Sequence, residues 1–478
     1  MAKWSCTRKT LKTIKEDIIV MRNESINLKN IVEMQRNFFN TNKTKSIEYR
    51  IKMLKRLEKV IKDNEEIIFS ALYEDLSKSK AESYMTEIAM VYSEIHYILK
   101  NIKRWSKPKR VRGSKSTFPA RNYIYSEPYG VVLIISPWNY PFNLTIAPLI
   151  DAIAAGNCAI IKCSEYSINT SKVIEKIIKD TFDESYIYCL NPNFDHDELL
   201  NQKYDYIFFT GSARVGKIIM REASYNLTPV SLELGGKSPC IIDETADINL
   251  AAKRITWGKL LNAGQTCVAI DYVVVHRNVK DEFISALRKE IKTRYPDVLN
   301  NKDYPKIINE RHYERLVNLI KTDKDIIGGN KNDKDQKIEP TIFPNSDFDH
   351  EIMKEEIFGP LLPIIEYDDI NEVIDIIKSR EKPLACYIFS QEKENSNYII
   401  NRLSFGGGCV NDVIIHLTNP NMPFGGVGYS GIGFYHGKYG FETFSHKKSV
   451  VKNTRFLDIS FRYAPFNDKK LKKIKRIM

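Results

Sequence analysis

The sequence contains no long apolar run. Its longest apolar stretches, such as Val131–Ile135, are as long as a β-strand, whereas a helix that crosses a membrane needs about 20 apolar residues. The apolar stretch at residues 18–21 is shorter than the core of a secretory signal, which has about 7–15 residues. We therefore expect neither a transmembrane helix nor secretion.

The cysteines also lack any pattern. The eight of them include no Cys-x-x-Cys pair and have no neighbouring histidine. This spacing argues against a zinc site and against a disulfide framework. We expect no metal and a cytoplasmic location.

A basic face for nucleic acid is missing as well, although the formal net charge is +12. Residues 1–20 and 469–478 together supply +9 of it. The basic pI thus describes two tails rather than the folded body, and nucleic-acid binding is not expected.

The C-terminal tail has two interpretations. Leu471, Ile474 and Met478 are at helical spacing among six cations, which would suit weak contact with an anionic membrane surface. Since so short a helix is marginal by itself, a solvated, frayed terminus is the preferred interpretation.

The order of elements predicts an α/β protein. Residues 29–105 show helical periodicity, residues 107–120 resemble a linker, and a strand follows at 122–126. Strands and helices then alternate from residue 130 to 224, which is typical of a parallel sheet covered by helices. A second α/β series is expected to begin near Pro229.

One motif suits a phosphate group. Residues 206–216 predict a strand, a glycine turn and a helix capped by Ser212, an arrangement that directs free N–H groups at an anion. The spacing is neither the Rossmann nor the Walker pattern, so a purely structural turn stays open. Lys162 and Glu165, where the second strand ends, suit a nucleotide ribose, but taken alone they are better interpreted as solvated charges.

Three other positions suit covalent chemistry. Cys267 is placed in a turn between a helix and a strand, where a nucleophile would be accessible, although most cysteines are buried structural residues. Glu233 interrupts an apolar strand, and burial would raise its pKa toward that of a general base. Asn139, between Pro137 and Pro141, could donate to an oxyanion or simply stabilise its turn.

Seven motifs in this order, PWNYP, KCSE, FFTGSARVG, LELGGK, GQTC, EEIFGP and PFGGVGYSG, resemble the aldehyde dehydrogenase superfamily. The likeness spans roughly residues 29–465 and is closest to the class 3 and fatty aldehyde dehydrogenases, as judged by residues 35–39, 411–416, 435–438 and 461–465. It implies an α/β fold with two doubly wound parallel-sheet domains and a small oligomerisation flap.

The resemblance also implies roles for residues. Cys267 would be the nucleophile, Asn139 the oxyanion donor and Glu233 the base that hydrolyses the thioester. Residues matching the NAD or NADP site are Ser136, Pro137, Trp138, Lys162, Glu165, Gly211, Ser212, Ala213, Arg214, Val215, Gly216, Leu234, Gly235, Glu356 and Phe358. Tyr140, Trp257 and His416 match the substrate tunnel, which would suit a medium- or long-chain aliphatic or an aromatic aldehyde.

The resemblance divides the chain into segments. Expected are an N-terminal extension (1–28), a cofactor-binding domain (29–106 and 128–229), a catalytic domain (230–410), a flap with a C-terminal tunnel segment (107–127 and 411–465), and a basic tail (466–478). A homodimer is expected, with residues 122–126 and 449–453 pairing in the flap. A CoA-acylating dehydrogenase and an inactive binding protein are the alternatives, and the intact Cys267, Glu233 and Asn139 argue against both.

Overall fold

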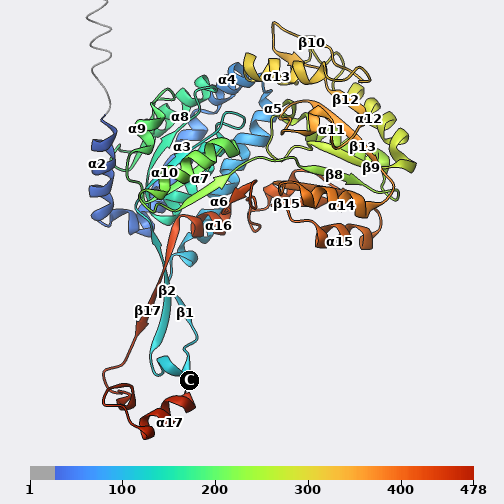
Figure 1. Ribbon diagram of the computed structural model, residues 1–478. Coiled ribbons are helices and arrows are strands. Elements are labelled where there is room, and N and C mark those ends of the chain that lie inside the picture. Colours follow the sequence, from blue (N-terminus) through green and yellow to red (C-terminus); the bar gives the residue numbers. More distant parts are fainter. Residues whose placement is uncertain (1–26, 478) are drawn as a thin grey trace, which may run out of the picture.

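The computed structural model describes residues 27–477 (Figure 1). Of the predicted N-terminal extension, residues 1–26 lie outside this range, as does Cys6. The described chain forms two six-stranded sheets with helices around them, and a three-stranded stem that projects from this body. No helix in the described range is long and apolar enough to cross a membrane.

The first sheet has the strand order β16-β7-β6-β3-β4-β5 and is parallel except for β16. Its strands are β3 (Val131–Ile135), β4 (Cys158–Lys162), β5 (Ile187–Leu190), β6 (Tyr206–Thr210), β7 (Val230–Glu233) and β16 (Gly431–Ile432). All residues of β3, β4 and β6 are buried, because helices cover both faces. This explains why β3 is continuously apolar.

The helices around the first sheet come from the first half of the chain and from one C-terminal segment. They are α2 (Leu28–Asn40), α3 (Ile47–Asp63), α4 (Glu65–Leu76), α5 (Lys80–Ser83), α6 (Ala89–Trp105), α7 (Asn143–Ala155), α8 (Ile168–Thr181), α9 (His196–Leu200), α10 (Ala213–Ser224) and α16 (Gly437–Thr443). A π-helical turn, η2 (Tyr84–Ile88), joins α5 to α6. The predicted helical opening segment thus consists of several helices.

The second sheet is entirely parallel, with the order β12-β13-β9-β8-β14-β15. Its strands are β8 (Pro239–Ile242), β9 (Tyr272–His276), β12 (Thr341–Ser346), β13 (Leu361–Tyr367), β14 (Ala385–Phe389) and β15 (Gly407–Val410). Its helices are α11 (Ile248–Leu260), α12 (Lys280–Arg294), α13 (Glu310–Ile320), α14 (Ile370–Ser379) and α15 (Lys393–Arg402). A small hairpin, β10 (Lys331–Asn332) and β11 (Lys337–Ile338), lies outside this sheet.

The boundary expected at residue 230 is wrong by one strand. The strand β7 pairs in parallel with β6, so it completes the first sheet instead of opening the second. Local sequence could not reveal this, because an apolar strand followed by glycines suits either sheet equally. The consequence is functional, since Glu233 at the end of β7 belongs to the first sheet while Cys267 is carried by the second unit.

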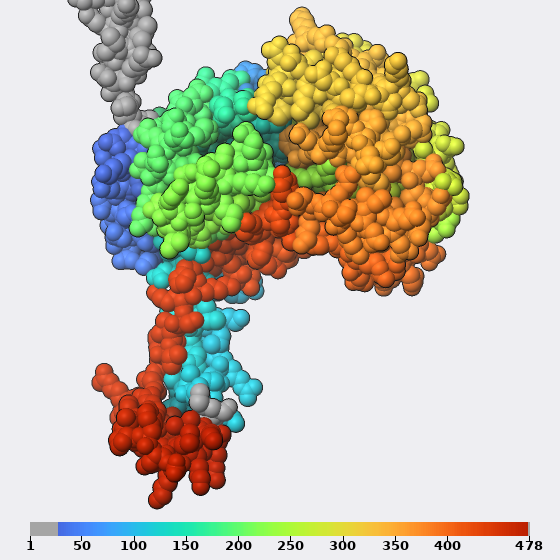
Figure 2. All heavy atoms as spheres, in the orientation of Figure 1, coloured from blue at the N-terminus to red at the C-terminus, as the bar shows by residue number. Residues whose placement is uncertain are grey.

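The stem is the sheet β1-β2-β17 (Figure 2). In it β2 (Arg121–Pro128) pairs with β1 (Lys109–Val111) and with β17 (Ser445–Lys452), and Ile124 is opposite Ser449. The predicted pairing of the two flap segments is therefore confirmed, and residues expected to be a linker include β1. Beyond the stem, the basic tail forms the helix α17 (Asp468–Ile477) and not the frayed terminus that we preferred.

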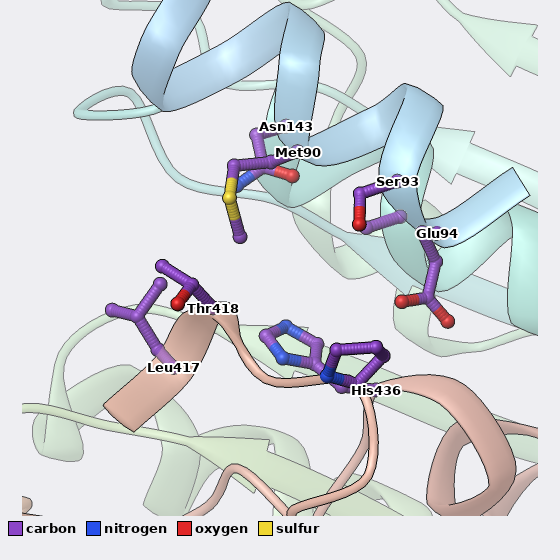
Figure 3. Close-up of a pocket in the computed structure, with 9 residues that line it drawn as sticks. Met90, Ser93, Glu94, Asn143, Leu417, Thr418 and His436 are labelled. Atoms are coloured by element: carbon purple, nitrogen blue, oxygen red, sulfur yellow. The ribbon is translucent and has the colours of Figure 1, made fainter. Parts of the chain in front are cut away.

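The C-terminal segment is attached to the first sheet's helices by buried carboxyl groups. Glu94 on α6 accepts a hydrogen bond from the N–H of Gly437 (2.7 Å), and Asp151 on α7 packs against Gly440. Figure 3 shows the pocket beside this contact, where Glu94 lies near His436. Burial raises the pKa of Asp151 well above its usual value, and the neighbouring Glu94 raises it further.

Replacement of Asp151 by asparagine is expected to make stability less sensitive to pH. Because the folded-state pKa of Asp151 is raised, only the native state keeps the proton above the usual aspartate pKa, so stability falls as the pH rises. The loss is about 1.4 kcal/mol per pH unit over that interval for one proton. The midpoint temperature of thermal unfolding should rise for D151N relative to the unmodified protein as the pH increases from 5 to 8. Parallel changes of the two midpoints with pH would contradict this.

Candidate functional site

Cys267 lies in a strained loop before β9. The short helix η4 (Leu261–Gly264) precedes it, and within η4 both Asn262 (φ 51°) and Ala263 (φ 52°) have left-handed backbone conformations. Such conformations persist in non-glycine residues only where the surroundings enforce them, and they are common at functional sites. The thiol is half-buried, so the loop holds it beneath the surface without sealing it off.

The loop after β3 is bonded directly to the Cys267 loop. The Asn139 Nδ2 atom donates to the carbonyl of Gln265 (3.0 Å), and the Asn262 Nδ2 atom donates to the carbonyl of Asn139 (2.8 Å). The hydroxyl groups of Tyr140 and Thr266 are 2.6 Å apart. The structure therefore brings the predicted oxyanion donor to the nucleophile loop, and one N–H of its amide is left for a substrate oxygen.

The Cys267 thiol is held in its protonated form. Burial, followed by the charges of Glu356 and Glu233, raises the pKa of this thiol to about 12. A thiol with that pKa attacks a carbonyl carbon only when a base takes its proton. The charges of both carboxyl groups therefore act on the sulfur.

Glu233 is the last residue of β7 and is almost completely buried. Neither of its carboxylate oxygens has a hydrogen-bond partner within the described residues. Burial raises its pKa well above the usual value, as the sequence predicts for a general base. A buried carboxyl group without a partner costs free energy, so its retention beside a thiol indicates chemistry rather than stability.

An ion pair between two other residues anchors the segment that contains Glu356 and Phe358. Lys237 binds Asp271 and donates to the carbonyl of Glu355 (2.9 Å), and this arrangement anchors the segment that contains both predicted cofactor residues. The Glu356 carboxylate lies against Gly235, where a Cβ atom would clash with it. Burial raises the pKa of Glu356 to about 8.

Aromatic side chains pack together next to the segment that contains Glu356. The Phe358 ring meets Trp138 edge to face with the ring centroids 5.3 Å apart, and Trp138 also contacts His312 at 5.1 Å. Phe358 has a positive φ of 49°, which directs its ring by means of a strained backbone. Trp138 and Phe358 thus come together as predicted, from loops of different sheets.

The glycine turn after β6 opens the helix α10. Ser212 is its N-cap, and its Oγ atom accepts from the N–H of Val215 (3.4 Å), as predicted. A Cβ atom at Gly211 would clash with Phe209, and one at Gly216 would come 2.9 Å from Leu234. These glycines therefore allow close packing of α10, and the cap uses the N–H of Val215 but leaves those of Ala213 and Arg214 in the first turn for an anion.

The other end of the predicted cofactor site is at β4. The Lys162 ammonium is buried and donates to the carbonyls of Cys163 (3.0 Å) and Pro192 (2.6 Å), and Glu165 is 3.6 Å away with a partly exposed carboxylate. The N–H of Ser136 donates to the carbonyl of Lys162 (3.1 Å). Lys162 ends β4, Ser136 follows β3 and α10 follows β6. The carboxyl ends of such parallel neighbours form the edge where nucleotides bind.

The three residues predicted to line the substrate tunnel do not form one cluster. Tyr140 is bonded to Thr266, whereas Trp257 on α11 is half-buried. His416 has its Nδ1 atom 3.6 Å from the sulfur of Cys409, and burial lowers its pKa to about 4. No contact in the described residues joins these three side chains to one another.

Sequence reasoning missed several supporting residues. Gln265 accepts the N–H of Ile308 (3.0 Å), and Tyr387 donates to the carbonyl of Val268 (2.6 Å), so both anchor the Cys267 loop. Tyr435 lies near Cys267 and Glu233, whose charges help to raise its pKa. Only Gln265, beside Cys267 in the motif GQTC, had a signal in the sequence.

Comparison with known proteins adds independent information. A model of the aldehyde dehydrogenase family matches residues 16–450, and this range begins inside the segment that we expected to precede the domain. The chain is 48% identical over 448 residues to the 4,4'-diaponeurosporen-aldehyde dehydrogenase of Staphylococcus aureus (92% of this chain, 98% of the relative). It is 43% identical over 427 residues to the dimeric NADP-preferring aldehyde dehydrogenase of Mus musculus (89% and 94%).

Two further matches agree with these. The aldehyde dehydrogenase family 3 member A2 of Rattus norvegicus is 40% identical over 444 residues, which are 92% of each chain. A solved structure of the substrate-bound state of Staphylococcus aureus AldH superimposes with a TM-score of 0.91 at 46% identity and covers 94% of this chain and 99% of that one. The residues that the family model matches, 16–450, include both sheets and every loop of the site.

Proposed function

Because the chain belongs to the aldehyde dehydrogenase family and oxidises aldehydes with NAD or NADP, we propose that Cys267, Glu233 and Asn139 carry out this reaction. The predicted likeness to class 3 members is confirmed by the family 3 relative. The observation that carries the proposal is the buried Glu233 carboxylate, which has no hydrogen-bond partner among the described residues and whose charge acts on the Cys267 thiol, while Asn139 is bonded to the Cys267 loop.

The first step forms a carbon–sulfur bond. The Cys267 sulfur attacks the aldehyde carbon as its proton passes to a carboxylate whose charge acts on the thiol, that of Glu356 or Glu233, and the carbonyl oxygen becomes the oxyanion of a thiohemiacetal. The Asn139 amide and the backbone N–H of Cys267 donate to this oxygen. Such donors are effective because they are oriented before the reaction begins.

The second stage releases the acid. A nicotinamide cofactor held by Glu356, Phe358 and the N-terminus of α10 would supply the hydride acceptor for this oxidation, which would leave a thioester on Cys267. Glu233 then takes a proton from water, whose oxygen attacks the thioester carbon and expels the sulfur. The products are a carboxylate and the regenerated thiol, without coenzyme A.

We propose an apolar substrate, either a medium- or long-chain aliphatic or an aromatic aldehyde. The predicted tunnel residues Tyr140 and Trp257 are aromatic, Trp257 is half-buried, and aromatic side chains bind apolar groups. The name of the Staphylococcus aureus relative also specifies an aldehyde other than a small one. The test measures NAD and NADP reduction in parallel for aldehydes from two carbons upward and for benzaldehyde; kcat/KM that falls as the chain lengthens would contradict the proposal.

Replacement of Glu165 by glutamine is expected to shift cofactor preference toward NADP. The partly exposed Glu165 carboxylate, at the proposed ribose end beside Lys162, would repel a 2′-phosphate, and removing its charge should raise kcat/KM for NADP by about 10-fold relative to NAD. The matched control is E175Q on α8, which removes the same charge outside the proposed cofactor site. An unchanged NADP/NAD ratio in E165Q would place the ribose elsewhere.

We also propose that the protein is a homodimer. The stem is a three-stranded sheet whose strand β17 is exposed along most of its length, and a sheet of this size is stable only when one face is covered. A second copy could cover it, and the name of the Mus musculus relative calls that protein dimeric. Sedimentation equilibrium should give twice the chain mass, and a single-chain mass would contradict the proposal.

Finally, we propose a cytoplasmic protein that contacts anionic membrane surfaces through α17. This helix carries six cations and no acid after Asp468, and the apolar side chains Phe456, Phe466 and Leu471 are exposed around it. The seven cysteines of the described residues are all free, which suits a reducing compartment.

Flotation with vesicles tests this contact. Binding to phosphatidylcholine vesicles that contain phosphatidylserine is expected, with little binding to phosphatidylcholine alone. The variant K472E/K473E should bind at least about 10-fold more weakly, because each lysine near such a surface contributes about 1 kcal/mol. The variant K289E/K292E makes the same charge change on α12 and should bind normally; equal losses in both would exclude a specific role for α17.

A further inference from the structure

Three ionisable side chains from one short segment are buried behind the site. Lys78, Glu82 and Glu87 belong to the segment that contains α5 and the π-helical turn η2, and each is less than a tenth exposed. The side chains of Lys78 and Glu87 are completely inaccessible. A buried ion pair stabilises a fold little, because desolvation offsets the attraction between the charges. Its position must therefore be explained by its contacts.

The Lys78 ammonium is directed at the loop of the oxyanion donor. Its Nζ atom donates to the Oε1 atom of Glu87 (2.7 Å) and to the backbone carbonyl of Asn139 (2.9 Å). It also lies 3.9 Å from the centre of the Tyr140 ring. Lys78 thus binds the main chain of Asn139 and the ring that follows it.

The two glutamates extend these contacts on either side. The Oε2 atom of Glu87 accepts from the N–H groups of Phe142 and Asn143, both at 3.0 Å, which fixes the end of the same loop at α7. The Oε1 atom of Glu82 accepts from the N–H of Asn262 (2.7 Å), the first of the two left-handed residues before Cys267. One segment therefore holds both loops of the site.

We propose that Lys78 is a positioning residue, which orients the Asn139 amide toward the oxyanion through its hydrogen bond to the Asn139 carbonyl. The inference depends on the proposed oxyanion role of Asn139. Lys78 does not touch the substrate. Its ammonium, with its charge balanced by Glu87, fixes the peptide from which the amide projects, and small displacements of such a donor are costly to catalysis.

A double-mutant cycle separates positioning from general stabilisation. K78M is expected to lower kcat about 10- to 100-fold in a chain that contains Asn139, and to have almost no further effect in an N139A chain, because the group it orients is absent. KM for NAD should change less than twofold in each variant. K337M is the matched control, since Lys337 is another buried lysine that donates to a backbone carbonyl, that of Asn301, away from the site.

The outcomes distinguish the two proposals. If N139A alone retains full kcat, the oxyanion role fails, whatever K78M does. If N139A is impaired and K78M lowers kcat equally in both backgrounds, Lys78 acts independently of Asn139 and the positioning role is overturned. Should K78M fail to fold because Glu87 is left uncompensated, the cycle is run with K78M/E87Q, in which both charges are removed and the glutamine oxygen can still accept from α7.

Discussion

Replacement of Cys267 by alanine is expected to lower kcat for aldehyde oxidation by at least about 10⁴-fold, because no other group can form the thioester. This sulfur lies in a strained loop to which the proposed oxyanion donor Asn139 is bonded, and the charge of the proposed base Glu233 acts on it; the other described cysteines lack that combination. KM for NAD should change little. The assay follows cofactor reduction at saturating aldehyde.

The control for this experiment is C386A. Cys386 is a buried thiol on β14 in the second sheet, and its removal tests the general cost of losing a cysteine. Mass spectrometry after incubation with aldehyde and cofactor should detect an acyl adduct on Cys267 alone. Full turnover by C267A, or an adduct elsewhere, would reject Cys267 as the nucleophile. No turnover and no adduct in the unmodified protein would restore the alternative of an inactive binding protein.

Replacement of Glu233 by glutamine is expected to lower steady-state kcat by about 10²- to 10⁴-fold while the thioester accumulates. Cys267 could still be acylated, so a burst of one reduced cofactor per site should precede the slow phase. The acid limb of the pH profile should also change. Because the pKa of Glu233 is raised, deacylation in the unmodified protein increases as the pH rises through that pKa, and E233Q should lose this dependence.

E94Q is the control for this variant, since Glu94 is also a buried carboxyl group but, unlike Glu233, is bonded to a backbone N–H, that of Gly437. Addition of coenzyme A tests the alternative of a CoA-acylating dehydrogenase. If the enzyme transferred its acyl group to coenzyme A, Glu233 would be dispensable and E233Q would turn over normally in its presence. Full turnover of E233Q under either condition removes Glu233 from the hydrolytic step.

Much of the fold was predictable because local signals were strong. The continuous apolar stretch of β3 predicted a strand covered on both faces, and Ser212 predicted the start of α10. The boundary at residue 230 failed, since strand pairing is a long-range property that the residues of β7 do not encode alone. The prediction of a frayed C-terminal tail was wrong for a different reason. A marginal helix propensity does not by itself exclude a helix, and the tail forms α17.

The sequence by itself determined which side chains could do chemistry. A thiol in a turn, a carboxyl group in an apolar strand and an amide between two prolines were visible as Cys267, Glu233 and Asn139, and the order of the motifs identified the family. Each was ambiguous alone, because the same residue types occur as structural groups.

Only the tertiary structure decided how these groups meet. Glu233 ends a strand of the first sheet, Cys267 precedes a strand of the second, and Asn139 reaches across to the carbonyl of Gln265. Their distances in the chain carry no information about this contact, because it is made by the packing of two sheets. The proposed role of Lys78 could not be predicted from the sequence either, because a lysine is expected at the surface. Only the fold buries Lys78 and bonds it to the carbonyl of Asn139.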